Sequence, residues 1–135
     1  MTDRDPHDHP DRPIRIVLDA SAIVAFSRGS IHAGEVIAEV DDEHAAVGLP
    51  VLCLVEATRG TADPTRLDLL VNHRAGVVLG DEPGDWRALA ATYDIVGRLD
   101  AAAAALAAID LGCAVLTAQP GLYGGLAGGG PIIAI

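Results

Sequence analysis

Short apolar runs alternate with longer helical segments along this sequence, and this alternation constrains the fold more than any other feature. The apolar runs are the expected strands, which are residues 14–18, 45–50, 76–80, 114–118 and 131–135. The segments between them are the expected helices, which are residues 20–28, 30–44, 51–60, 63–73, 85–97 and 98–112. Strands that are apolar throughout are typical of parallel sheets buried on both faces, with helices as the crossover connections. The sequence therefore predicts an α/β fold, a three-layer α/β/α sandwich with a central parallel sheet.

The length of 135 residues is that of one domain. We expect residues 1–13, which are rich in charged residues and proline, to be a disordered N-terminal tail, and residues 14–135 to form the domain. Half of the residues are hydrophobic, but there are only one Trp, two Tyr and one Phe, so the core must be built from Ala, Val, Leu and Ile. No apolar stretch is long enough to cross a membrane, so we expect a soluble, cytoplasmic protein.

The charged residues exclude several functions. The formal net charge is -10, and all nine basic residues are arginines. The lack of lysine excludes enzymes that need a Schiff-base or P-loop lysine, and it argues against haloacid-dehalogenase phosphatases and receiver domains. An acidic chain is a poor general binder of nucleic acid, so any such contact must be local. Cys53 and Cys113 lack the CxxC spacing of a redox or zinc site, and we expect both to be buried thiols.

Three isolated acids stand at the start or in the middle of otherwise apolar elements. Asp19 directly follows the first strand, at the edge where ligands bind in such sheets, although it could simply cap the next helix, where Ser21 could also bond the first free amides. Glu56 is the only acid of the helix at 51–58, although it could form an ion pair with Arg59. Asp100 opens an alanine-rich helix, which it could cap.

Together these three acids are more informative than any one of them. Clustered carboxylates repel one another unless a divalent cation binds between them. Oxygen-only ligands select Mg²⁺ or Mn²⁺, which in turn take phosphate oxygens as ligands. The chemistry predicted is metal-assisted hydrolysis of a phosphodiester. By contrast, we expect Asp41, Asp42 and Glu43 to form a solvated helix end.

Four segments resemble the PIN-domain family, in particular its VapC-like toxin ribonucleases. They are "IVLDASAIVAF", "LVEATRG", "LDAAAAALAAIDLGCAVLTAQ" and "PIIAI", in this order, and the similarity extends over residues 14–135. The resemblance implies the parallel α/β/α sandwich of the family and its activity, an endoribonuclease that depends on Mg²⁺ or Mn²⁺.

Site residues follow from the resemblance position by position. The family's first three acids match Asp19, Glu56 and Asp100, which are implied to be catalytic and to hold one metal ion. Ser21 matches the small hydroxyl residue two places after the first acid. The fourth acid, which follows a Thr-Ala pair, falls on Gln119, so that Thr117 and Gln119 are expected beside the metal. This is a departure, because a glutamine can orient water but adds no charge.

The resemblance also implies partners. Family members are commonly homodimers whose paired sites form an RNA groove, which Arg28, Arg59 and Arg98 could line, although each could equally be a surface ion-pair partner. The toxins are held inactive by an antitoxin protein, and a basic antitoxin peptide would be attracted to an acidic surface. A second hypothesis remains open, namely a degenerate PIN-like protein that binds RNA or a partner without cleavage. Gln119, the acidity and the glycine-rich segment 121–130 favour it, and the three acids favour the nuclease.

Overall fold

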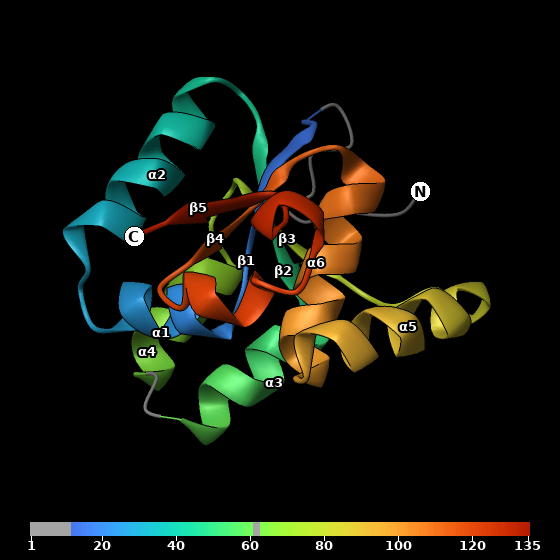
Figure 1. Cartoon of the computed structure of the whole chain (residues 1–135). Coiled ribbons are helices and arrows are strands. Elements are labelled where there is room, and N and C mark those ends of the chain that lie inside the picture. Colours follow the sequence, from blue (N-terminus) through green and yellow to red (C-terminus); the bar gives the residue numbers. More distant parts are fainter. Residues whose placement is uncertain (1–11, 61–62) are drawn as a thin grey trace.

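The computed structural model describes residues 12–60 and 63–135, which form a five-stranded sheet covered by helices (Figure 1). The strands are β1 (Ile14–Leu18), β2 (Ala46–Pro50), β3 (Gly76–Leu79), β4 (Ala114–Thr117) and β5 (Ile132–Ala134). All pairings are parallel and the strand order is β3-β2-β1-β4-β5. The predicted α/β/α fold with a central parallel sheet is confirmed.

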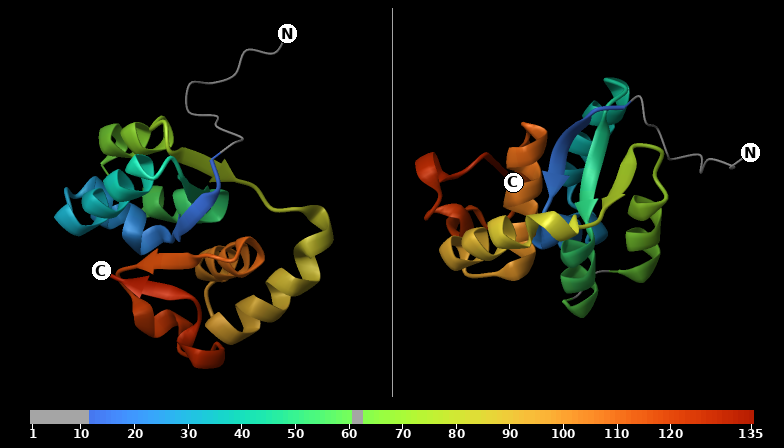
Figure 2. Two further views of the ribbon diagram at one scale, coloured as in Figure 1. Left: turned by 90° about the horizontal axis from the view of Figure 1, so that it is seen from above. Right: turned by 90° about the vertical axis from the view of Figure 1, so that its right-hand side faces the viewer.

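Helices cover both faces of this sheet. They are α1 (Ala20–Ser27), α2 (Ile31–Asp42), α3 (Val51–Arg59), α4 (Pro64–Val71), α5 (Trp86–Val96) and α6 (Leu99–Leu111). Figure 2 shows α1, α2 and α4 on one side of the sheet and α6 on the other. Helix α3 contacts both α1 and α6 at the ends of the strands, and α5 packs on α6 away from the sheet. Short 3₁₀ turns at Pro83–Asp85, Pro120–Tyr123 and Ala127–Gly129 complete the chain.

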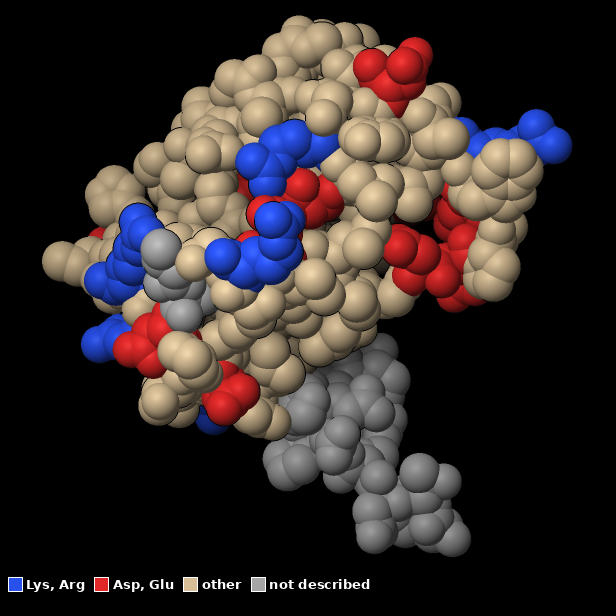
Figure 3. All heavy atoms as spheres, turned by 90° about the horizontal axis from the view of Figure 1, so that it is seen from below, with Lys and Arg blue, Asp and Glu red and all other residues tan. Residues whose placement is uncertain are grey.

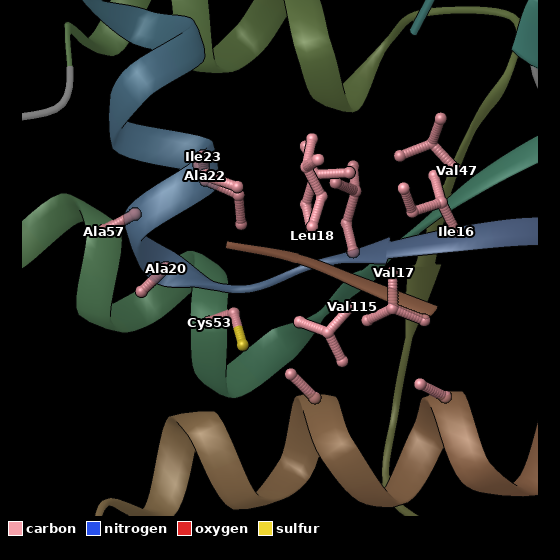
Figure 4. Close-up of a cluster of buried hydrophobic side chains, with 14 of the residues drawn as sticks. Ile16, Val17, Leu18, Ala20, Ala22, Ile23, Val47, Cys53, Ala57 and Val115 are labelled. Atoms are coloured by element: carbon pink, nitrogen blue, oxygen red, sulfur yellow. The ribbon is translucent and has the colours of Figure 1, made fainter. Parts of the chain in front are cut away.

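Alternating side chains of the central strand fill the core on its two faces. In Figure 4, Leu18 lies toward α1, whereas Val17 and Val115 of the neighbouring strand lie toward α6. Helix α6 presents a stripe of alanines to the sheet, and Ala101, Ala104, Ala105 and Ala108 are all buried. This spacing places the four methyl groups on one helix face, and their small size lets the helix approach the strands closely.

Helix ends follow the predicted capping residues in most places. Asp63 caps α4 by accepting from Thr65 N at 2.9 Å, and Pro64 occupies the first turn as expected. Gly112 ends α6 with φ of 68°, a left-handed conformation that glycine adopts without strain. The expectation that Ser21 bonds the first free amides of α1 is wrong, because the Asp19 carboxylate takes this position and accepts from Ala22 N at 3.0 Å.

Asp41 corrects the expectation of a solvated helix end. Its side chain is largely buried and accepts from Arg12 Nη1 at 2.9 Å and from Arg74 Nη2 at 2.6 Å. Hydrogen bonds from Arg74 and Arg12 hold the pKa of this carboxyl well below its usual range. Asp41 therefore joins the end of α2 to the segment before β1 and to the loop before β3.

Three further expectations concern the chain ends, the thiols and the membrane. Residues 1–11 of the expected tail lie outside the described residues, and Arg12 already contacts the fold through Asp41. Cys53 is buried as expected, but Cys113, which directly precedes β4, is partly exposed. In the described part of the chain, no helix combines the length and apolarity that a membrane span requires.

Candidate active site

The strand order places a ligand site between β1 and β4. The chain leaves β1 toward β2 and β3 on one side, and it later returns to β4 and β5 on the other side. Ligands of such sheets bind at the carboxyl ends of the strands where the order reverses. Asp19 directly follows β1, where its N–H donates to Leu116 O at 3.2 Å, and Thr117 is the last residue of β4.

Asp19 is a buried carboxylate, with 2% of its surface exposed, whose oxygens accept three hydrogen bonds. Oδ1 accepts from Ser21 Oγ at 2.6 Å and from Ala22 N at 3.0 Å. Oδ2 accepts from Tyr123 Oη at 2.6 Å. A buried charge requires such partners, because it is costly without them. Asp19 therefore both caps α1 and places a negative charge at the switch point, so the two interpretations of this residue are compatible.

Ser21, Thr117 and Gln119 form a hydrogen-bonded chain next to Asp19. Ser21 Oγ lies 3.2 Å from Thr117 Oγ1 and accepts from Ala118 N at 2.9 Å. Gln119 N donates to Thr117 Oγ1 at 2.9 Å, and its side chain is exposed. Because Ser21 uses its only proton on Asp19, the Thr117 hydroxyl must donate to Ser21. The chain thus fixes the orientation of the Asp19 carboxylate.

Glu56 and Asp100 are brought together by one arginine. Arg98 Nε and Nη2 donate to Asp100 Oδ1 and Oδ2 at 3.2 and 3.3 Å, and Nη2 lies 3.7 Å from Glu56 Oε2. Glu56 also pairs with Arg59 at 3.1 Å, so the expected ion pair is present. Asp100 makes no cap bond to α6, because its side chain faces Arg98 instead.

The same charges act on three groups of the site. The pKa of Arg98 is raised, first by its hydrogen bond to Asp100 and then by the charges of Asp100, Glu56 and Asp19. Burial raises the pKa of Tyr123, and the Asp19 charge raises it further. Burial and the charges of Asp19 and Asp100 likewise raise the pKa of the Cys53 thiol, whose Sγ donates to Asp100 O at 3.2 Å. Tyr123 and Cys53 therefore stay protonated at neutral pH, and neither is an activated nucleophile.

Two of the three acids, Glu56 and Asp100, pair with a cation of the chain itself, Arg98. Among the described residues, no three His, Cys, Asp or Glu side chains form a group that could hold a metal ion as they stand. Instead, Asp100 and Glu56 pair with the Arg98 guanidinium, and the charge of Asp19 contributes to its raised pKa. An all-oxygen donor set of this kind would suit Mg²⁺ or Mn²⁺. The assignment of Asp19, Glu56 and Asp100 as metal ligands stays a prediction.

A pocket of about 370 Å³ opens above this network. Its lining includes Ser21, Arg28, Glu56, Arg98 and Gln119, whereas Asp19 lies below its floor. Figure 3 views the molecule from the side toward which β1 runs, and there arginine side chains lie on both sides of a group of acidic ones. The mouth of this pocket thus offers both positive and negative side chains.

Sequence reasoning offered Arg98 as an ion-pair partner, which the structure confirms, but it missed Tyr123 and the identity of the acids that pair with Arg98. Tyr123 is fully buried and lies in the 3₁₀ turn Pro120–Tyr123. Its one sequence signal is that it is the only aromatic residue of the glycine-rich segment 121–130. For Arg98, the signal is its place two residues before Asp100, at the N-cap position of α6.

Comparisons with known proteins find similarity to solved structures. No protein-family model matches the chain, and no curated protein matches it. Among solved structures, the chain is similar to the crystal structure of PAE2754 from Pyrobaculum aerophilum, a PIN-domain protein, with a TM-score of 0.60 and 20% identity. The alignment covers 91% of this chain and 90% of that one. The fold is PIN-like. At this identity the likeness concerns the PIN-like fold alone.

Proposed function

We propose that this chain is a PIN-type endoribonuclease that depends on Mg²⁺ or Mn²⁺. One observation carries the proposal: a buried carboxylate, Asp19, lies at the switch point of a PIN-like sheet, where Glu56 and Asp100 pair with Arg98, whose pKa the Asp19 charge also raises. Ligands of α/β sheets bind at this point.

The residues of the site divide the work of phosphodiester hydrolysis. Asp19, Glu56 and Asp100 would hold the metal, which when bound supplies an activated water and stabilises charge on the phosphate. Glu56 has the most exposed side chain of the three, 32% against 12% for Asp100. It is therefore suited to accept the proton of the attacking water at a carboxylate oxygen. Gln119 at the pocket lining orients water through its amide.

RNA would contact the arginines at the mouth of the pocket. Arg28 and Arg98 line this pocket, and Arg59 lines a second one beside it. Arginine binds phosphate oxygens through its forked donors. Because the chain has a net charge of -10, RNA binding is expected to be weak and strongly dependent on salt.

Cleavage of a structured RNA with and without Mg²⁺ or Mn²⁺ tests the proposal. Asp19→Asn and Asp100→Asn are expected to abolish cleavage. Asp110→Asn is a matched control, because Asp110 is an exposed acid of the same helix as Asp100 and is expected to keep full activity. Cleavage without metal, or cleavage that survives both substitutions, contradicts the nuclease.

A second candidate is a PIN-like protein that binds RNA or a partner without cleavage. It is favoured by Gln119 in the fourth position and by Arg98, whose guanidinium already pairs with two of the acids. This candidate predicts no turnover with any divalent ion and no Mn²⁺ binding tighter than millimolar in calorimetry. Gln119→Asp would restore the fourth acid, and a gain in Mn²⁺ affinity would support the metal site.

We also propose two partners for this chain, a second copy of itself and an antitoxin peptide. A homodimer would use the exposed apolar side chains of Val55, Tyr93 and Leu99, which line one pocket between α3 and the α5–α6 turn. A basic antitoxin peptide fits a pocket of about 320 Å³ beside Trp86, where Figure 3 shows acidic side chains around a hollow. Its acidic lining consists of Asp81, Glu82, Asp85 and Asp110.

The two free thiols of the chain agree with a cytoplasmic protein.

A further inference from the structure

We propose that Arg98 is a built-in competitor for the divalent ion: its guanidinium occupies the position between Asp100 and Glu56, and metal binds only when this side chain swings outward. The inference rests on the proposed function and deepens it, because it names the residue that sets the metal affinity of the site.

The contacts of Arg98 indicate how its side chain would pair with the acids of the site and how it would leave them. It meets Asp100 through two bonds, Nε to Oδ1 at 3.2 Å and Nη2 to Oδ2 at 3.3 Å, a forked arrangement that blocks both oxygens of this carboxylate. Its contact with Glu56 is longer, at 3.7 Å. The Arg98 side chain is 42% exposed, against 12% for Asp100, so Arg98 is the partner with open solvent to move into.

Two pockets meet at this arginine. Arg98 and Glu56 line both the pocket that contains Ser21 and Gln119 and the neighbouring pocket that contains Asp100. Asp100 lines only the second of these two pockets. An outward rotation of Arg98 would join the two pockets and open the Asp100 carboxylate toward the side where Ser21 and Asp19 lie.

The backbone confines this motion to the side chain. Arg98 O accepts from Ala102 N at 2.9 Å, the first bond of α6. Gly97 before it ends α5 in a left-handed conformation, with φ of 86°. The position of Cα is thus fixed between two helix ends, and rotamer changes of an exposed side chain are fast. The competition is therefore an equilibrium between one bound guanidinium and one bound metal ion.

The charges of the guanidinium and of the divalent ion determine whether removal of Arg98 raises or lowers the metal affinity. A guanidinium carries one positive charge and a divalent ion carries two, so the ion wins at sufficient concentration. Part of the binding free energy of the divalent ion is used to break the pairs of Arg98 with Asp100 and Glu56, which weakens its apparent affinity. Removal of the guanidinium is expected to tighten Mn²⁺ binding roughly five- to tenfold, in line with the worth of a partly exposed, forked ion pair.

Calorimetric titration of the full chain with Mn²⁺ tests this inference. Arg98→Gln is expected to bind Mn²⁺ more tightly than the unchanged protein. Arg59→Gln is the matched control, because Arg59 also pairs with Glu56 but does not contact Asp100, and it is expected to change the affinity little. Arg98→Lys keeps one charge but loses the fork, so it is expected to lie between, and it serves if Arg98→Gln does not fold.

The outcomes separate this inference from the proposed function. Equal or weaker Mn²⁺ binding by Arg98→Gln, or an equal gain in Arg59→Gln, overturns the role of Arg98 while the metal site stands. Absence of Mn²⁺ binding in every variant overturns both. Tighter binding by Arg98→Gln without RNA cleavage by any variant supports the competition and overturns the nuclease.

Discussion

At the scale of single residues, Asp19 shows how one side chain serves both the fold and the site. Its place after a buried strand is readable from the sequence, because strand ends and switch points are set by local pattern and topology. Its bond from the Tyr123 hydroxyl cannot be predicted in this way, because Tyr123 lies 104 residues further along the chain. The pairing of Arg98 with both Glu56 and Asp100 was likewise beyond reach, since it depends on how α3 packs against α6.

Removal of the Tyr123 hydroxyl should weaken the fold. Tyr123→Phe keeps the ring but leaves Asp19 Oδ2 without its donor, and a buried acceptor that loses its partner costs roughly 1–3 kcal/mol. We expect the free energy of unfolding in urea to fall by this amount. Tyr93→Phe is the control, because Tyr93 is exposed, and it should be neutral. Equal stability of the two variants would show that the Tyr123–Asp19 bond contributes nothing.

Asp41 predicts how stability depends on pH. Its folded pKa lies below the ordinary value of 3.8, because of its bonds to Arg74 and Arg12. The stabilisation is therefore complete above that ordinary value and is lost as the pH falls through the lower, folded pKa. At pH 7, Asp41→Asn should reduce the free energy of unfolding by roughly 1.5 kcal/mol, a modest value because Arg74 is open to solvent.

Denaturation curves at several pH values check this expectation. The difference between the unchanged protein and Asp41→Asn should be constant near neutral pH and should shrink below about pH 4. Asp42→Asn is the control, since Asp42 is the exposed neighbour on the same helix end, and it should have little effect at any pH. A difference that grows in acid would contradict the assignment.

At the scale of elements, periodicity and capping residues were sufficient to locate the helices and strands. Asp63 with Pro64 at the start of α4 and Gly112 at the end of α6 lie where their local chemistry predicts. Asp41 was misjudged because its partners, Arg12 and Arg74, lie 29 and 33 residues away in sequence. The local sequence pattern determines where a helix or strand lies, whereas the contacts at its end depend on which distant residues the fold places beside it.

The alanine stripe of α6 should tolerate no larger side chain. Ala104 is fully buried against the sheet, so Ala104→Leu would force side chains off their rotamers and should reduce the free energy of unfolding by roughly 1–3 kcal/mol. Ala90→Leu on the exposed surface of α5 is the control and should change it little. Thermal denaturation followed by circular dichroism measures both. A neutral Ala104→Leu would mean that α6 packs loosely.

At the scale of the whole molecule, strand order brings the site residues from both halves of the chain to one edge. Asp19 follows β1 and Thr117 ends β4, although they are far apart in sequence. The same architecture leaves the apolar face of Val55, Tyr93 and Leu99 uncovered in one chain. We propose this face as the homodimer surface.

Self-association through this face can be tested by mass. Val55→Glu introduces a charge that would be desolvated in a dimer, so it should shift the protein from dimer to monomer in size-exclusion chromatography with light scattering. Leu69→Glu, on exposed α4, is the control and should leave the mass unchanged. A monomeric unchanged protein at high concentration would exclude the homodimer.

Trp86 is the only tryptophan of the chain, and it stands at the rim of the acidic pocket with 60% of its surface exposed. The Arg87 guanidinium lies over its ring at 4.5 Å from the centroid. Indole emission shifts to longer wavelength in water, so the native protein should already fluoresce almost as the denatured chain does. Intrinsic fluorescence is thus a poor reporter of melting here and a sensitive reporter of any molecule that settles against α5.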